Sequence, residues 1–62
     1  MKAEFDNAII KVWFNSQSTS RNFYNVKAIV QDGNSALIRT TNGDQHLINF
    51  NNVNMIEEIA KK

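Results

Sequence analysis

The stretch Val26 to Phe50, VKAIVQDGNSALIRTTNGDQHLINF, decides the fold, because it predicts three β-strands joined by two tight turns. Asn42-Gly43 is a strong hairpin signal, since both residues tolerate the positive φ that tight turns between twisted strands require. Asp32-Gly33-Asn34 predicts a second turn of the same kind. The runs between the turns are rich in β-branched and aliphatic residues, which favour strands. We therefore expect a three-stranded antiparallel meander.

The strands on either side of Asn42-Gly43 can pair in two registers. A two-residue turn would put Leu37 opposite Ile48, whereas a three-residue loop with a bulge at Gly43 would put Ala36 opposite Ile48 and Ile38 opposite His46. We expect the bulged register, because it separates an apolar face from a mixed one. The apolar face would hold Ala36, Ile38, Ile48 and Phe50, and the other face Leu37, Arg39 and Leu47.

Alternating hydrophobicity predicts a further strand over residues 7–15, NAIIKVWFN, and places the meander's first strand after residue 22. Residues 1–6 are expected to be a frayed lead-in, and the polar residues 15–22 a mobile loop. In the early strand the expected core face is Ala8, Ile10, Val12 and Phe14, with Ile9, Lys11 and Trp13 outside. In the next strand the expected core face is Tyr24, Val26, Ala28 and Val30, with Phe23, Lys27 and Ile29 outside. A strong bend in this strand would bury some residues of both sets.

The C-terminal segment has two interpretations. Residues 51–53 predict a short 3₁₀ turn followed by a short strand, but Val53, Ile56, Ile59 and Ala60 also have helical spacing. A fifth strand would cover an exposed sheet edge, and we favour it. The expected fold is therefore mainly β, a five-stranded small antiparallel barrel or strongly bent sheet in one domain over residues 1–62. The alternative is a three- to four-stranded meander with a C-terminal helix, an α+β fold.

This order of elements resembles the SH3-like and Sm-like small β-barrels. The shared features are a first strand, a long polar loop at 15–22, a meander at 23–50, a 3₁₀-like turn at 51–53 and a last strand. The resemblance covers about 50 residues and rests on element order. The aromatic-acidic stretch of signalling SH3 domains is absent, so the resemblance does not imply binding of proline-rich peptides. It implies a small barrel fold.

Composition excludes several classes of function. The 62 residues contain no Cys and one His, and seven basic against six acidic residues leave a net charge of +1. Asp44 and His46 are too few for a metal site, and no nucleophile motif accompanies them. We therefore expect no enzyme, cofactor, metal or small-molecule substrate. No apolar run is long enough to span a membrane, and we expect a cytoplasmic protein.

Both faces of the predicted strands carry large apolar residues, which a sheet with one solvated face would not need. A partner protein or a second copy of the chain would cover the outer face, and a homodimer would also compensate for the small core. We expect a self-associating binding module. The residues predicted to form its partner-binding surface are Trp13, Phe23, Ile29, Leu37 and Leu47.

Single-stranded DNA or RNA is the alternative partner. Basic side chains beside aromatic rings suit nucleic acid, because cations contact phosphates while rings stack on bases. The residues predicted for that role are Lys11, Trp13, Arg21, Phe23, Lys27 and Arg39. A third interpretation needs no partner: Trp13 and Phe23 would complete a second apolar layer together with Ile9, Ile29, Leu37 and Leu47.

Overall fold

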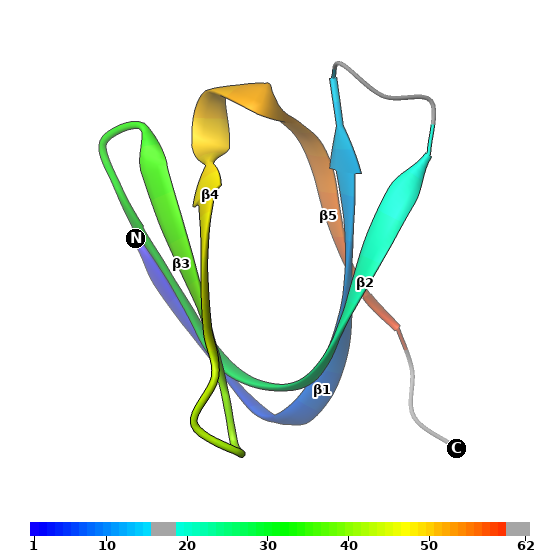
Figure 1. Ribbon diagram of the computed structural model, residues 1–62, viewed down its shortest axis with the longest axis vertical. Helices are drawn as coiled ribbons and strands as arrows, with labels where there is room; N and C mark the ends of the chain where they lie inside the picture. The colour runs from blue at the N-terminus through cyan, green and yellow to red at the C-terminus, as the bar shows by residue number, and fades with distance from the viewer. Residues whose placement is uncertain (16–18, 60–62) are drawn as a thin grey trace.

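The protein is a five-stranded antiparallel sheet in the computed structural model, which describes residues 1–15 and 19–59 (Figure 1). The strands are β1 (Lys2–Phe14), β2 (Ser20–Asp32), β3 (Ser35–Thr40), β4 (Gln45–Asn49) and β5 (Val53–Ile59), with a 3₁₀ turn, η1 (Phe50–Asn52), between the last two. Their order across the sheet is β4-β3-β2-β1-β5. The mainly β prediction is confirmed. The alternative with a C-terminal helix is wrong, because residues 53–59 pair with β1 as a strand.

The sheet is bent into two arms that face each other across the core (Figure 1). One arm consists of β4, β3, residues 26–32 of β2 and residues 2–6 of β1, and we call it the meander arm. The other, the β5 arm, consists of β5, residues 8–14 of β1 and residues 20–24 of β2. Hydrogen bonds do not close the sheet into a barrel, since β4 and β5 are its two edges. Of the two forms predicted, a small barrel and a bent sheet, the structure is therefore the bent sheet.

Two asparagines lie where the long strands bend. Asn7 in β1 and Asn25 in β2 have φ of 60° and 59°. The pairing of β1 with β2 shifts register between Glu4 and Ala8 and again between Ala8 and Ile10. Asn tolerates this left-handed conformation better than other residues with a Cβ, and extra residues on one strand bend a sheet and increase its twist. These bulges allow two strands to serve both arms.

The hairpin between β3 and β4 has the predicted bulged register. Ala36 lies opposite Ile48, and Ile38 lies opposite His46. Gly43 has φ of 91°, and its amide donates to the Thr40 carbonyl at 3.2 Å. The buried Thr40 hydroxyl accepts a hydrogen bond from the Asp44 amide at 2.9 Å, so the turn leaves this polar side chain satisfied.

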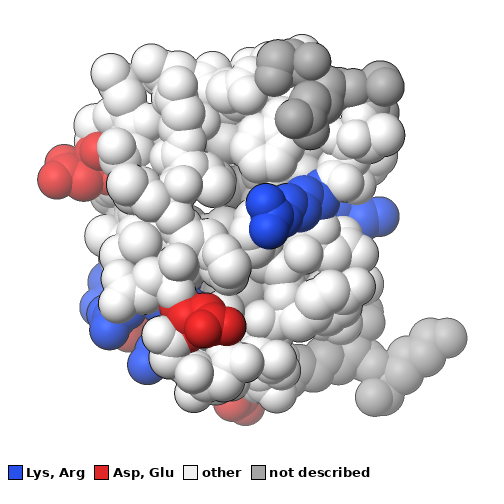
Figure 2. All heavy atoms as spheres, viewed as in Figure 1, with Lys and Arg blue, Asp and Glu red and all other residues white. Residues whose placement is uncertain are grey.

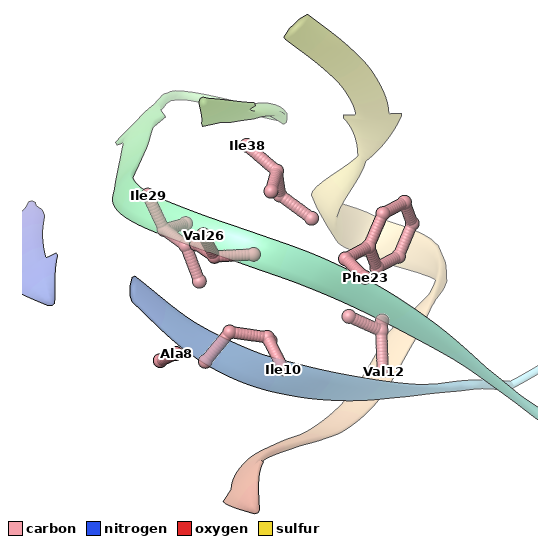
Figure 3. Close-up of a cluster of buried hydrophobic side chains, with 7 residues drawn as sticks. All are labelled: Ala8, Ile10, Val12, Phe23, Val26, Ile29 and Ile38. Carbon is pink, nitrogen blue, oxygen red and sulfur yellow. The ribbon is translucent and has the colours of Figure 1, made fainter. Parts of the chain in front are cut away.

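The core lies between the arms and is made by β1, β2 and β3. Figure 3 shows its side chains directed toward one another from these three strands. Ile10, Val12, Val26 and Ile38 are fully buried. Phe5, Phe14, Ile48, Val53 and Ile56 pack around this cluster and are partly buried. The predicted inward face of the early strand is confirmed, with Ala8, Ile10 and Val12 buried.

The predicted phase of β2 is wrong at four positions. Phe23 and Ile29 were expected outside but are 4% and 2% exposed, whereas Tyr24 was expected in the core and is 55% exposed. Val30 was also expected in the core, but it is half-buried and lies opposite Leu37 on the outer face. The cause is the bulge at Asn25, together with a second register shift between Val26 and Ala28 against β3. Each extra residue reverses the alternation of faces, so β2 buries members of both phases.

Two expected segment boundaries also need correction. Residues 1–6 are not a frayed lead-in: β1 begins at Lys2, and the Met1 ammonium donates to the Gln31 carbonyl at 2.9 Å. The loop expected over 15–22 is shorter, because β2 begins at Ser20. Residues 16–18 of that loop lie outside the described residues. Pairing extends β1 and β2 to 13 residues each, which is long enough for both to bend through the two arms.

Candidate functional site

The two arms meet along two gaps, and side chains close one of them. In the gap between β4 and the first part of β2, the Phe23 and His46 rings lie 5.1 Å apart between centroids at 56° to each other. The Arg21 guanidinium carbon lies 5.1 Å from the Phe23 ring centroid, so Phe23 has a ring contact and a cation contact. This gap is filled by contacts within the chain.

The other gap, between the first part of β1 and β5, holds an apolar groove of about 500 Å³. This volume is in the range of sites that bind ligands or peptide side chains. Among the described residues that line it, only Asn54 has a polar side chain and no side chain is charged, while the Met1 ammonium donates to the Gln31 carbonyl. The lining residues are Met1, Ala3, Phe5, Ile29, Phe50, Val53, Asn54, Met55 and Ile56.

One wall of the groove is a strand edge whose outward backbone groups pair with no residue in 1–15 or 19–59. Met1 and Gln31 exchange two hydrogen bonds, of 2.9 and 2.8 Å. Backbone groups alternate in direction along an antiparallel strand, so Lys2 and Glu4 direct their amide and carbonyl groups away from β2, toward this gap. Such an edge can accept hydrogen bonds from, and donate them to, an added extended segment.

Two flexible apolar side chains lie on the rim of the groove. Met1 is 65% exposed and Met55 is 46% exposed, although both are large and apolar. Methionine has three rotatable bonds and a polarisable sulfur, and it adapts to partners of different shape. The rim therefore combines exposed apolar surface with the ability to repack.

The sequence analysis missed this groove. Met1 and Phe5 fell in the expected lead-in, and Met55 fell in the segment left open between strand and helix. A usable signal was present, because Ala3 and Phe5 alternate with Lys2 and Glu4 as in a strand with one apolar face. Residues 1–5 lie close to residues 53–56 because β1 bends at Asn7. No pattern in the sequence marks this bend as clearly as Asn42-Gly43 marks the hairpin.

The residues predicted to bind a partner do not form one surface. Phe23 and Ile29 are buried in the core, which is the correction described above. Leu37 and Leu47 lie directly opposite each other on the outer face of the meander arm, where Leu37 is half-buried and Leu47 is 73% exposed. Trp13 lies on the β5 arm. Of the predicted set, the structure brings together on its surface only the two leucines.

Trp13 is half-buried by its own neighbours. Its indole Nε1 donates to Glu57 Oε1 at 2.7 Å, and the Lys11 ammonium nitrogen lies 5.7 Å from the centre of the ring. Lys11 is also opposite Glu57 in the pairing of β1 with β5. The carboxylate offsets the lysine charge and occupies the indole donor, so this cluster is satisfied internally.

The basic residues predicted for nucleic acid are dispersed. Arg21 lies against Phe23 at the closed gap, while Arg39 is on the meander arm opposite Ala28. Lys27 is exposed at the β2 register shift, and Lys11 has Glu57 beside it. On the face shown in Figure 2, the Lys and Arg side chains lie in separate places, with uncharged surface between them. The structure gathers no basic stripe from these four residues.

The remaining predicted chemistry can be placed briefly. His46, the only histidine, is half-buried against Phe23. Among residues 1–15 and 19–59, no three His, Cys, Asp or Glu side chains are grouped so that they could hold a metal ion. No helix within those residues has the length and apolar character needed to cross a membrane. Comparison of the chain with protein-family models, curated proteins and solved structures found no match.

Proposed function

We propose that the protein is a non-enzymatic, self-associating binding module whose groove takes an extended apolar segment of a partner protein. The observation that carries this proposal is the apolar groove between the first part of β1 and β5. Its apolar lining would bury side chains of the partner, at roughly 25 cal/mol per Å² of apolar surface. The sequence predicted an outer apolar face as the partner-binding surface, and we propose this groove in its place.

The chemistry of the groove selects the kind of occupant. Because no lining side chain is charged, an apolar and uncharged segment fits it without leaving a buried charge unpaired. The free backbone groups of Lys2 and Glu4 at its edge favour an extended segment, which would add to the sheet as a strand. A helix would leave those backbone groups without partners.

The fold and setting fit such a role. A five-stranded bent sheet is compatible with a small SH3-like or Sm-like barrel, and we propose that relationship on element order alone. A chain without cysteine needs no oxidising compartment, and we propose that it acts in the cytoplasm. Nucleic-acid binding has less support, because the basic residues are dispersed and Lys11 is offset by Glu57.

A peptide selection tests the proposed function. The full chain would serve as bait for a display library of random peptides, and the selected peptides would be measured against Met55→Glu. We expect apolar peptides whose affinity falls about ten-fold or more in this variant, because the new carboxylate would be desolvated in the groove.

The matched control is Tyr24→Glu, which puts the same charge on an exposed side chain that does not line the groove. Selected peptides should bind this variant as they bind the unmodified protein. Circular dichroism would establish that both variants keep the strand signal. Selection of no peptide, or equal binding to Met55→Glu, would contradict the proposal.

A further inference from the structure

We infer that the protein self-associates by two-fold pairing of β4 with β4 of a second copy, centred on Leu47. This inference rests on the self-association proposed above and names the strand that forms the contact. The β4 edge is a different surface from the groove, so an experiment can contradict the dimer without contradicting the groove, and the reverse.

The free edge of β4 exposes the backbone groups of alternate residues. The Thr40 amide donates to the Asp44 carbonyl at 3.0 Å, and the Phe50 amide donates to the Asn34 carbonyl at 2.7 Å. These bonds lie at the two ends of the β3–β4 ladder and set its phase, because hydrogen-bonded pairs recur every second residue. The residues in the opposite phase are Gln45, Leu47 and Asn49, and their amide and carbonyl groups point away from β3.

The side chains of those residues continue an apolar row across the outer face. Leu47 lies opposite Leu37, and Leu37 lies opposite Val30 on β2. Leu37 and Val30 are half-buried, whereas Leu47 at the edge is 73% exposed. A strand added at this edge would cover Leu47 and extend the row. No neighbour within the described residues pairs with β4 on that side.

The side chains on either side of Leu47 in β4 are of the same chemical type. A strand with this symmetry matches itself in an antiparallel pair, so the occupant is a second copy of the chain. About Leu47, an amide side chain lies two residues away on each side, Gln45 before it and Asn49 after it. In a two-fold antiparallel pair, Leu47 faces Leu47 of the second copy, and Gln45 faces its Asn49. The Asn49 Oδ1 already accepts from the Asn51 amide at 3.1 Å, so the Asn49 NH₂ group would donate to the Gln45 Oε1 of the second copy, and the two cross-strand pairs would be equivalent, as an isologous interface requires.

Charge distinguishes this edge from the other edge strand of the sheet, β5. Natural sheets protect exposed edges with charged residues, and β5 carries Glu57 and Glu58. β4 has no Lys, Arg, Asp, Glu or Pro between Gln45 and Asn49. Pairing of two β4 strands therefore places no fixed like charges opposite each other.

Sedimentation equilibrium over a concentration series up to millimolar tests the inference. We expect a monomer–dimer equilibrium for the unmodified chain and a dissociation constant raised about ten-fold or more in Leu47→Lys, because two lysines would then face each other. Met55→Glu is the matched control, since it changes the groove and leaves β4 intact. It should dimerise as the unmodified chain does.

Amide hydrogen exchange adds a readout that depends on the phase of β4. On dimerisation, the amides of Gln45, Leu47 and Asn49 should become protected, while those of His46 and Ile48 already bond within the sheet. A chain that stays monomeric at millimolar concentration would overturn the inference. So would a dimer that Leu47→Lys does not weaken, or one in which these three amides gain no protection.

Discussion

The Phe23 ring of β2 lies 5.1 Å from the His46 ring of β4, although these two strands are not neighbours in the sheet. The contact joins the two arms across a gap that backbone hydrogen bonds leave open. Phe23 is 4% exposed, and it also contacts the Arg21 guanidinium. Packing of side chains therefore replaces barrel closure on this side of the molecule.

We predict that Phe23→Ala lowers the free energy of unfolding by about 3–5 kcal/mol, because it removes a buried ring between the arms. Tyr24→Ala, at the neighbouring and exposed position, should change it by no more than about 0.5 kcal/mol. Urea titration followed by circular dichroism measures both. A larger loss of unfolding free energy for Tyr24→Ala than for Phe23→Ala would mean that Tyr24 faces the core and Phe23 faces solvent.

We predict that the bend depends on the left-handed conformation of Asn25, which has φ of 59°. Asn25→Ala should destabilise the protein by about 1 kcal/mol, since Ala meets the full steric cost of this conformation. Asn25→Gly should be neutral within about 0.5 kcal/mol, because relief of that cost offsets the greater freedom of the unfolded chain.

Asn22→Gly is the control for the Asn25 variants. Asn22 lies in the same strand without a positive φ, so glycine there brings the entropic cost, about 0.5–1 kcal/mol, and removes the exposed 3.4 Å hydrogen bond that its side chain donates to the Tyr24 hydroxyl. Thermal unfolding of the variants gives their order of stability. Equal losses for glycine at both positions would show that the Asn25 conformation does not matter.

We predict that a mixed-sequence single-stranded oligonucleotide does not bind at physiological salt, because no basic stripe accompanies Trp13. Fluorescence anisotropy of a labelled oligonucleotide checks this. Binding that weakens steeply with salt and disappears when Lys11→Ala and Lys27→Ala are combined would favour the nucleic-acid alternative instead, since phosphate contacts release counterions.

Local sequence signals predicted the short-range structure well. Asn42-Gly43 and the alternation of Ser35 to Phe50 were sufficient for the hairpin and its register, since both depend on residues close in the chain. The 3₁₀ turn was predicted at residues 51–53 and lies at Phe50–Asn52. The last strand did not follow from local pattern, which also fitted a helix, but from the expectation that a fifth strand covers an exposed sheet edge. The inward face of β1 followed from strict alternation between Ala8 and Phe14.

The long-range structure could not be predicted in the same way. A bulge at Asn25 moves Phe23 from the outer to the inner phase, and a single exposed Asn looks the same in a loop, a turn or a bulge. The candidate site depends on a bulge of the same kind, the bend of β1 at Asn7, because it brings Phe5 and Met55 to one groove from opposite ends of the chain. Of the apolar residues predicted to lie on the outer face, Phe23 and Ile29 are therefore in the core, whereas Leu37 and Leu47 lie outside as predicted.

The most direct test of the proposed function uses the only two methionines in the sequence, Met1 and Met55, which both line the groove. Protein labelled with ¹³C at the methionine methyl groups would be titrated with a selected apolar peptide, in the Leu47→Lys background to exclude pairing through β4. We predict that both methyl signals shift in NMR spectra and reach saturation together. Binding of the peptide with neither methyl signal shifted would contradict a site in this groove.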